Sequence, residues 1–163
     1  VSDFFKIPEP LIQKEFSRIM SLKDGLKKMS KSELSDLSRI NLTDDSDLIV
    51  NKIKKAKTDP LPMPNTIKDL DERLEAKNLL GMYASLTNST LEKSIEIFAG
   101  KNFSEFKEKL SEVLVDKIQP ISVEIKKLLD DKSYLDNTLL EGVERANIIA
   151  SKKIKRIKEI VGF

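Results

Sequence analysis

"RIMSLKDGLKKMSKS", residues 18–32, joins a short apolar run to a loop made largely of lysine and serine. The run at 16–22 has apolar residues at alternate and adjacent positions, which predicts a short buried strand. Asp24-Gly25 is a turn dipeptide that leads the chain from this strand into the loop. The glycine pattern of a P-loop is absent from the stretch.

The loop has two interpretations. Lys28 and Lys31 are three positions apart, with Ser30 between them and Ser32 after them. This spacing lets both ammonium groups converge on one polyphosphate while the hydroxyls donate to its oxygens. The alternative is an ordinary solvated loop, which any lysine-rich surface can produce.

Composition narrows the chemistry that the chain can perform. The 163 residues include no His and no Cys, so Ser–His and Cys–His nucleophile systems and thiolate metal sites are excluded. Net charge is +2, so any site for a polyanion must be a local patch rather than a global basic field. No apolar run is long enough to span a bilayer. The first residue is Val, and we expect the chain to be a fragment whose N-terminal part is missing.

The rest of the sequence predicts helices. Residues 43–57 begin with Thr and Asp and end with Lys, as a capped helix does, and Ile49, Ile53 and Ala56 form its apolar stripe. The prolines of 60–65 form a connector. Helices are then expected around 79–86, from a Ser89–Glu92 capping box to Gly100, and from about 106 onward, with Pro120 kinking or dividing the last of these.

The final helix is predicted to run from about 134 to 160. It carries apolar residues at helical spacing, which we expect to pack along its length against the other helices: Leu135, Leu139, Val143, Ala146, Ala150, Ile154, Ile157 and Val161. We expect the phenylalanines at 98, 103 and 106 to be core residues rather than base-stacking platforms.

Two groups of basic residues lie at helix ends. For Lys52, Lys54, Lys55 and Lys57, the favoured interpretation is a solvated helix C-terminus, with contact to RNA phosphate as the alternative. The cluster on the last helix has two open interpretations, dipole complementarity and contact with a nucleic-acid backbone; it comprises Lys152, Lys153, Lys155, Arg156 and Lys158.

Residues 28–32, "KMSKS", match the KMSKS motif of class I aminoacyl-tRNA synthetases letter for letter. With "NLTDD" and "KIKKAKTD" after it, the stretch resembles the bacterial tryptophanyl-tRNA synthetases. The helical remainder, including "EAKNLLGMYASLT" and "LLEGVERANIIASKKIKRIKEIVGF", resembles the C-terminal part of the same family. The resemblance covers nearly the whole chain.

The resemblance implies the edge of a Rossmann-type α/β nucleotide-binding domain, with a short strand and the loop at 1–43, followed by an all-helical domain at 44–163 that meets the anticodon arm of tRNA(Trp). It implies a mainly α chain from a cytoplasmic, homodimeric ligase that joins tryptophan to tRNA through a tryptophanyl-adenylate, using ATP with Mg²⁺. Lys28 and Lys31 would be the catalytic groups. The nucleotide-binding residues would be Ile19, Lys28, Met29, Ser30, Lys31 and Ser32, with no metal ligand in the chain.

The chain also departs from the family pattern. Its lack of His means that the His-rich motif of the family's N-terminal half is absent, and we expect the chain alone to be inactive. Glu33 stands where the family usually has Asp, which affects the resting geometry of the loop. A second hypothesis, from another class, is a free-standing helical RNA-binding or interaction module without catalysis.

Overall fold

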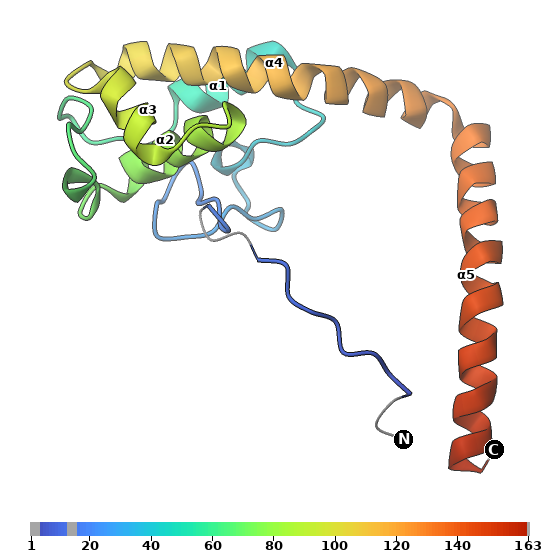
Figure 1. The fold of residues 1–163 in the computed structure, drawn as a ribbon. Helices are drawn as coiled ribbons and strands as arrows, with labels where there is room; N and C mark the ends of the chain where they lie inside the picture. Colours follow the sequence, from blue (N-terminus) through green and yellow to red (C-terminus); the bar gives the residue numbers. More distant parts are fainter. Residues whose placement is uncertain (1–3, 13–15, 163) are drawn as a thin grey trace.

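The computed structural model describes residues 4–12 and 16–162, and the chain is mainly helical, as predicted (Figure 1). No strand occurs in these residues. Short 3-10 helices lie at Asp36–Ser38 and Lys68–Leu70. The α-helices are α1 (Ser46–Lys54), α2 (Leu74–Leu86), α3 (Leu91–Phe98), α4 (Phe103–Asp130) and α5 (Lys132–Val161).

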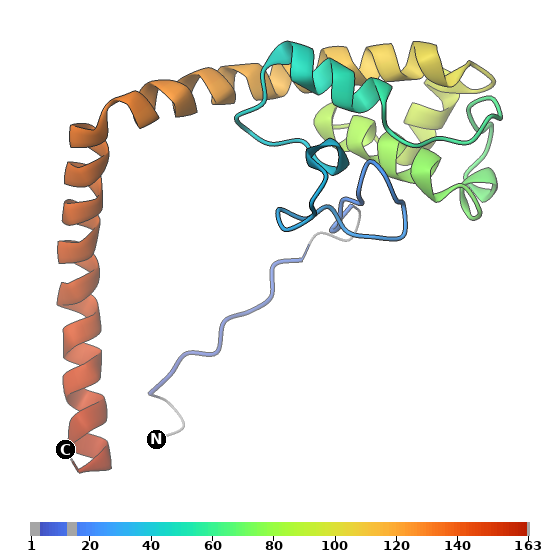
Figure 2. The same cartoon turned by 180° about the vertical axis from the view of Figure 1, so that it is seen from behind.

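The core lies where α1, α2 and α3 pack against the first half of α4 (Figure 2). Three aromatic rings meet there edge to face: the Phe98 centroid lies 4.9 Å from that of Tyr83 and 4.8 Å from that of Phe106. Phe98 and Phe106 are buried and Phe103 packs partly buried against them, so all three are core residues, as predicted. This core fixes the positions of α1 and α2, both of which pack against α4.

Helix α1 has the start and the apolar face that its sequence specifies. Asp45 is the N-cap, and its side chain accepts a hydrogen bond from the Leu48 N–H at 2.8 Å. Ile49, Ile53 and Ala56 are buried, which confirms the predicted stripe.

The strand predicted at 16–22 is wrong, since the segment makes only an isolated antiparallel bridge between Met20 and Lys28. Its backbone groups bond to several different segments instead of one neighbouring strand. The Asn78 side chain of α2 both donates to the Met20 carbonyl and accepts from the Met20 N–H, each at 2.9 Å. The Leu22 N–H donates to Ser38 O at 2.9 Å, and Leu22 O accepts from the Lys57 N–H at 2.7 Å. An extended segment bonded in this way satisfies its backbone without a sheet.

The expected packing of the last helix is also wrong. Helix α5 turns away from α4 and stands apart from the body of the chain (Figure 1). No residue of α5 is buried, and Ile154, toward the C-terminal end of the predicted apolar line, is 51% exposed. Helical periodicity therefore identified the apolar face correctly, but within the described residues the other helices do not cover that face.

Smaller corrections concern the helix ends. The N-cap of α3 is Thr90, not Ser89, and its hydroxyl accepts from the Lys93 N–H at 3.3 Å. Gly100 follows that helix in the left-handed region, with φ +70°, as expected of a glycine that terminates a helix. Pro120 lies inside α4 without dividing it. The parts of the expected entry loop at 1–3 and 13–15 lie outside the described residues.

Candidate nucleotide-phosphate site

A hollow of about 660 Å³ lies beside the lysine–serine loop. Its walls come from 17–19, from 28–31 and from 39–43. Among the described residues that line it, four are cationic and none is a carboxylate; the cations are Arg18, Lys28, Lys31 and Arg39. A concave surface with this charge attracts an anion rather than a cation or a neutral ligand.

The loop enters this hollow through a hydrogen-bonded turn. Asp24 O accepts from the Lys27 N–H at 3.1 Å, and the Asp24 side chain accepts from the Leu26 N–H at 3.0 Å, which confirms the predicted turn. Gly25 faces the start of α2, where an added Cβ would lie 3.1 Å from both the Glu75 nitrogen and the Leu74 Cβ. The glycine therefore lets the turn sit directly on α2.

Beyond the turn, the loop pairs with the segment that carries Ile19. The Met29 N–H donates to Ile19 O at 2.9 Å, and the Ser21 N–H donates to Lys27 O at 2.8 Å. These bonds hold Ile19 and Lys28 on adjoining walls of the same hollow. The Ser30 and Ser32 hydroxyl oxygens lie 2.9 Å apart.

The structure brings most of the predicted residues together. Ile19 lines the hollow with Lys28, Met29, Ser30 and Lys31, whereas Ser32 is exposed outside the lining set. Both lysines are exposed, and neither has an ion pair or side-chain hydrogen bond to any other described residue. Their ammonium groups are therefore available to an incoming anion.

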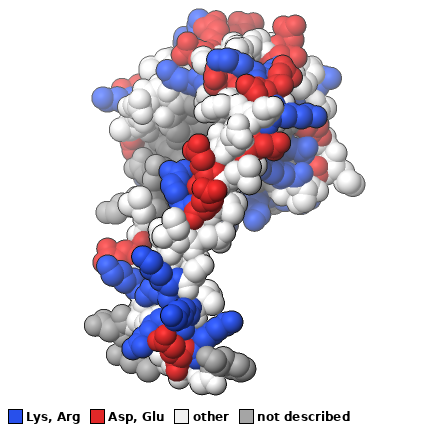
Figure 3. Space-filling model, turned by 90° about the vertical axis from the view of Figure 1, so that its right-hand side faces the viewer, with Lys and Arg blue, Asp and Glu red and all other residues white. Residues whose placement is uncertain are grey.

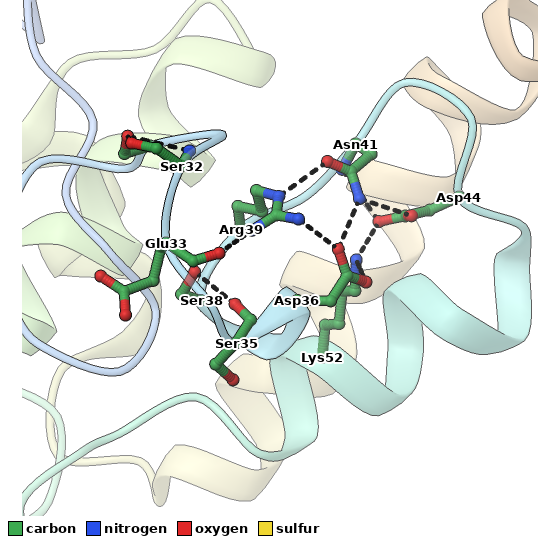
Figure 4. Close-up of polar contacts among 10 residues, drawn as sticks. Ser32, Glu33, Ser35, Asp36, Ser38, Arg39, Asn41, Asp44 and Lys52 are labelled. Carbon is green, nitrogen blue, oxygen red and sulfur yellow. Dashed lines mark hydrogen bonds and ion pairs between the residues drawn. The ribbon is translucent and has the colours of Figure 1, made fainter.

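Sequence reasoning missed a polar network behind the loop (Figure 4). The favoured interpretation of Lys52 as a solvated residue is wrong. Its side chain is fully buried, and Nζ lies 2.7 Å from Asp44 Oδ2 and 2.6 Å from Asp36 Oδ2. The hydrogen bonds from Lys52 and Asn41 hold the pKa of the Asp36 carboxyl below its usual value. In the sequence Lys52 lies three residues after Ile49, at the border of the apolar stripe, and this position is the signal that could have indicated its burial.

The basic cluster of α5 lies toward the C-terminal end of that helix, where Lys and Arg side chains gather in the lower part of Figure 3. Two of its members have intramolecular partners. Lys153 Nζ donates to Phe4 O at 2.7 Å and lies 4.0 Å from the centre of the Phe4 ring. Arg156 pairs with Glu159 at 3.0 Å.

Residues 1–120 match the model of the family described as tRNA synthetases class I (W and Y). The chain belongs to this family. Membership confirms the resemblance carried by the "KMSKS" loop and favours the synthetase hypothesis over the free-standing helical module.

Curated relatives of the chain carry the name tryptophan–tRNA ligase. The protein from Mesorhizobium japonicum is 47% identical over 163 residues, which is 100% of this chain and 46% of the relative. The protein from Rickettsia felis is 49% identical over 161 residues, or 99% of this chain and 48% of the relative. The chain thus spans about half the length of the curated relatives it matches.

Solved synthetase structures share the fold. The tryptophanyl-tRNA synthetase from Mycoplasma pneumoniae superposes with a TM-score of 0.74 at 24% identity, covering 93% of this chain and 45% of that one. The enzyme from Campylobacter jejuni, in complex with ADP and tryptophan, gives a TM-score of 0.69 at 22% identity, covering 99% and 48%.

Two further observations concern the described residues. Groups of three or more His, Cys, Asp or Glu placed to hold a metal ion are not found among them. Of their helices, none has the length and apolar character needed to cross a membrane.

Proposed function

We propose that this chain is part of a tryptophan–tRNA ligase and that its Lys28–Ser32 loop holds the phosphates of ATP. The observation that carries the proposal is the hollow itself: Lys28 and Lys31 belong to its cationic lining, and no described carboxylate lines it. The choice of tryptophan rests on relatives that bear the ligase name, at 47% and 49% identity. The remainder of such a protein would supply the tryptophan pocket.

In the proposed reaction, a carboxylate oxygen of tryptophan attacks the α-phosphorus of ATP. The bond from that phosphorus to the bridging oxygen breaks, and pyrophosphate leaves with the electron pair. Negative charge therefore grows on the departing oxygens, where the ammonium groups of Lys28 and Lys31 stabilise it. The nucleophile is already ionised, so the step needs no protein base, in keeping with a chain that has no His.

The nucleotide would span the hollow from the loop to the wall at Ile19. Ile19 and Met29 line that wall, and the hydrogen bond from the Met29 N–H to Ile19 O, 2.9 Å long, holds their backbones together there. A solved relative in complex with ADP supports a nucleotide at this fold. Mg²⁺ would arrive with ATP, since the hollow is lined by cations and hydroxyls whereas Mg²⁺ prefers phosphate and carboxylate oxygens.

In this proposal residues 1–43 complete the nucleotide-binding domain of a cytoplasmic homodimer, and residues 44–163 form the helical domain that meets tRNA. The basic residues at 152–158 of α5 could contact a phosphate backbone, because they are exposed on a helix that stands apart from the body of the chain. Loss of two such contacts should weaken tRNA binding and reduce its salt dependence.

Tryptophan-dependent exchange between ATP and pyrophosphate tests the proposal. The full-length protein should catalyse exchange with tryptophan and not with tyrosine. The 163-residue chain alone should show none, because one side of an ATP site cannot bring two reactants into line. Exchange with tyrosine only would overturn the substrate assignment, and exchange by the chain alone would show that it holds a complete site.

A further inference from the structure

The hydrogen bonds behind the loop run outward in series from a buried charge. Lys52 on α1 has a fully buried side chain, which is costly for an ammonium group unless anions neutralise it. Asp44, with a side chain only 4% exposed, supplies one partner, and Asp36, 49% exposed, supplies the other. The buried Lys52 therefore fixes the position of the Asp36 carboxylate.

Asp36 in turn fixes Arg39. Its Oδ1 lies 2.9 Å from Arg39 Nη2, and Arg39 Nε donates to Asn41 Oδ1 at 3.1 Å. The remaining edge of the guanidinium points to the loop, where Nη1 donates to Glu33 O at 2.9 Å (Figure 4). One planar group therefore contacts three acceptors, a geometry that arginine has and lysine lacks.

The bond to Glu33 matters because the segment just after the lysines has little else to hold it. Residues 31–34 are exposed, and their other hydrogen bonds in the part of the chain that the structure describes are to Ser30 or Ser32. The Arg39–Glu33 bond is the one that ties them to a residue outside the loop. The loop thus has one end paired with Ile19 and the other end held by Arg39.

We propose that Arg39 is a positioning residue for the lysine–serine loop, held in place by Asp36 and the buried Lys52. The inference rests on the proposed function for its catalytic consequence, although the anchoring itself does not. With the anchor, Lys31 lies near its working position before ATP arrives. Without it, the loop must be ordered during the reaction, and that ordering opposes the chemical step.

Arg39→Met removes the bond to Glu33 and keeps much of the apolar volume of the side chain. In the full-length protein it should lower the single-turnover rate of adenylate formation by about 10- to 100-fold while leaving tryptophan affinity unchanged. The rate of Arg39→Lys should lie between those of the parent and Arg39→Met, because an ammonium group can still pair with Asp36 but cannot reach all three acceptors. Arg145→Met is the matched control, since Arg145 is exposed on α5.

Trypsin provides a second readout that does not depend on activity. Without ATP, cleavage after Lys28 and Lys31 should be several times faster in Arg39→Met than in the parent or Arg145→Met, with melting temperatures compared in parallel. If Arg39→Met does not fold, Arg39→Lys carries the same test. Parental cleavage and adenylate rates in a folded variant would overturn the inference. A parent that forms no tryptophanyl-adenylate would overturn the proposed function, and the cleavage rates would still decide the anchoring.

Discussion

Replacing Lys52 with Met should destabilise the chain more than the same replacement at its exposed neighbours Lys54 and Lys55. The substitution keeps an unbranched side chain of similar length but removes the charge between Asp44 and Asp36, whose oxygens lie 2.7 and 2.6 Å from Nζ. Asp44 then remains buried as an unpaired anion. Breaking a buried pair in this way typically costs about 3–5 kcal/mol.

The structure favours the lower end of that range. Asp36 is 49% exposed and can regain water, and Asp44 keeps two donors from Asn41: the backbone N–H at 2.9 Å and Nδ2 at 3.2 Å. We therefore expect a loss of about 3 kcal/mol, which for a chain of this size corresponds to a fall of roughly 6–12 °C in melting temperature.

Urea denaturation of the parent, Lys52→Met and Lys55→Met measures the effect, because Lys55 is exposed near the end of the same helix. Lys55→Met should stay within about 0.5 kcal/mol of the parent. Adding Asp44→Asn to Lys52→Met should recover part of the loss, since it neutralises the stranded anion. If Lys52→Met matched Lys55→Met, Lys52 would not be buried as described and the support beneath Arg39 would be absent.

Ile154→Asp should shift the melting temperature of the chain by no more than a degree or two, because Ile154 is 51% exposed, whereas Phe106→Ala should cost about 3–5 kcal/mol; equal thermal shifts would contradict the described placement of α5. The hydrogen bond from Lys57 lowers the pKa of Glu75 in the folded chain, so the unfolded chain binds a proton first as pH falls. The free energy of unfolding should therefore fall as pH drops below about 4.5, the unperturbed pKa of Glu75. Thermal melts between pH 3 and 6 (roughly, the range that brackets carboxyl titration) should show a shallower slope for Glu75→Gln, and an unchanged slope would remove Glu75 from this account.

The sequence predicted those features that local chemistry determines. The Asp residues before α1 and the stripe of Ile49, Ile53 and Ala56 specify a capped amphipathic helix whatever the surroundings. The Asp24-Gly25 turn and the loop residues of the hollow were found for the same reason. A five-residue motif with a known neighbourhood then identified the family.

What the sequence could not predict depends on contacts between distant residues. Residues 16–22 have the composition of a strand, but the partners of their backbone include a side-chain amide from α2, which periodicity does not reveal. Lys52 borders the apolar stripe of α1, unlike the exposed Lys54 and Lys55, but its pairing with Asp36 and Asp44 depends on how the chain folds. The apolar face of α5 predicted packing against the other helices, and only the structure shows that the chain turns after α4 and directs α5 away from them.

The most direct test of the central claim is the rate of adenylate formation by the full-length protein with Lys31→Ala. Because the ammonium group meets charge that develops only as pyrophosphate departs, its loss should slow the single-turnover rate by roughly 10²- to 10³-fold. Tryptophan affinity, measured beside it, should be unchanged. Lys28→Ala should also slow the reaction, by an equal or smaller factor. An intact single-turnover rate, with only a raised KM for ATP, would make Lys31 a ground-state anchor and would contradict transition-state stabilisation by this loop.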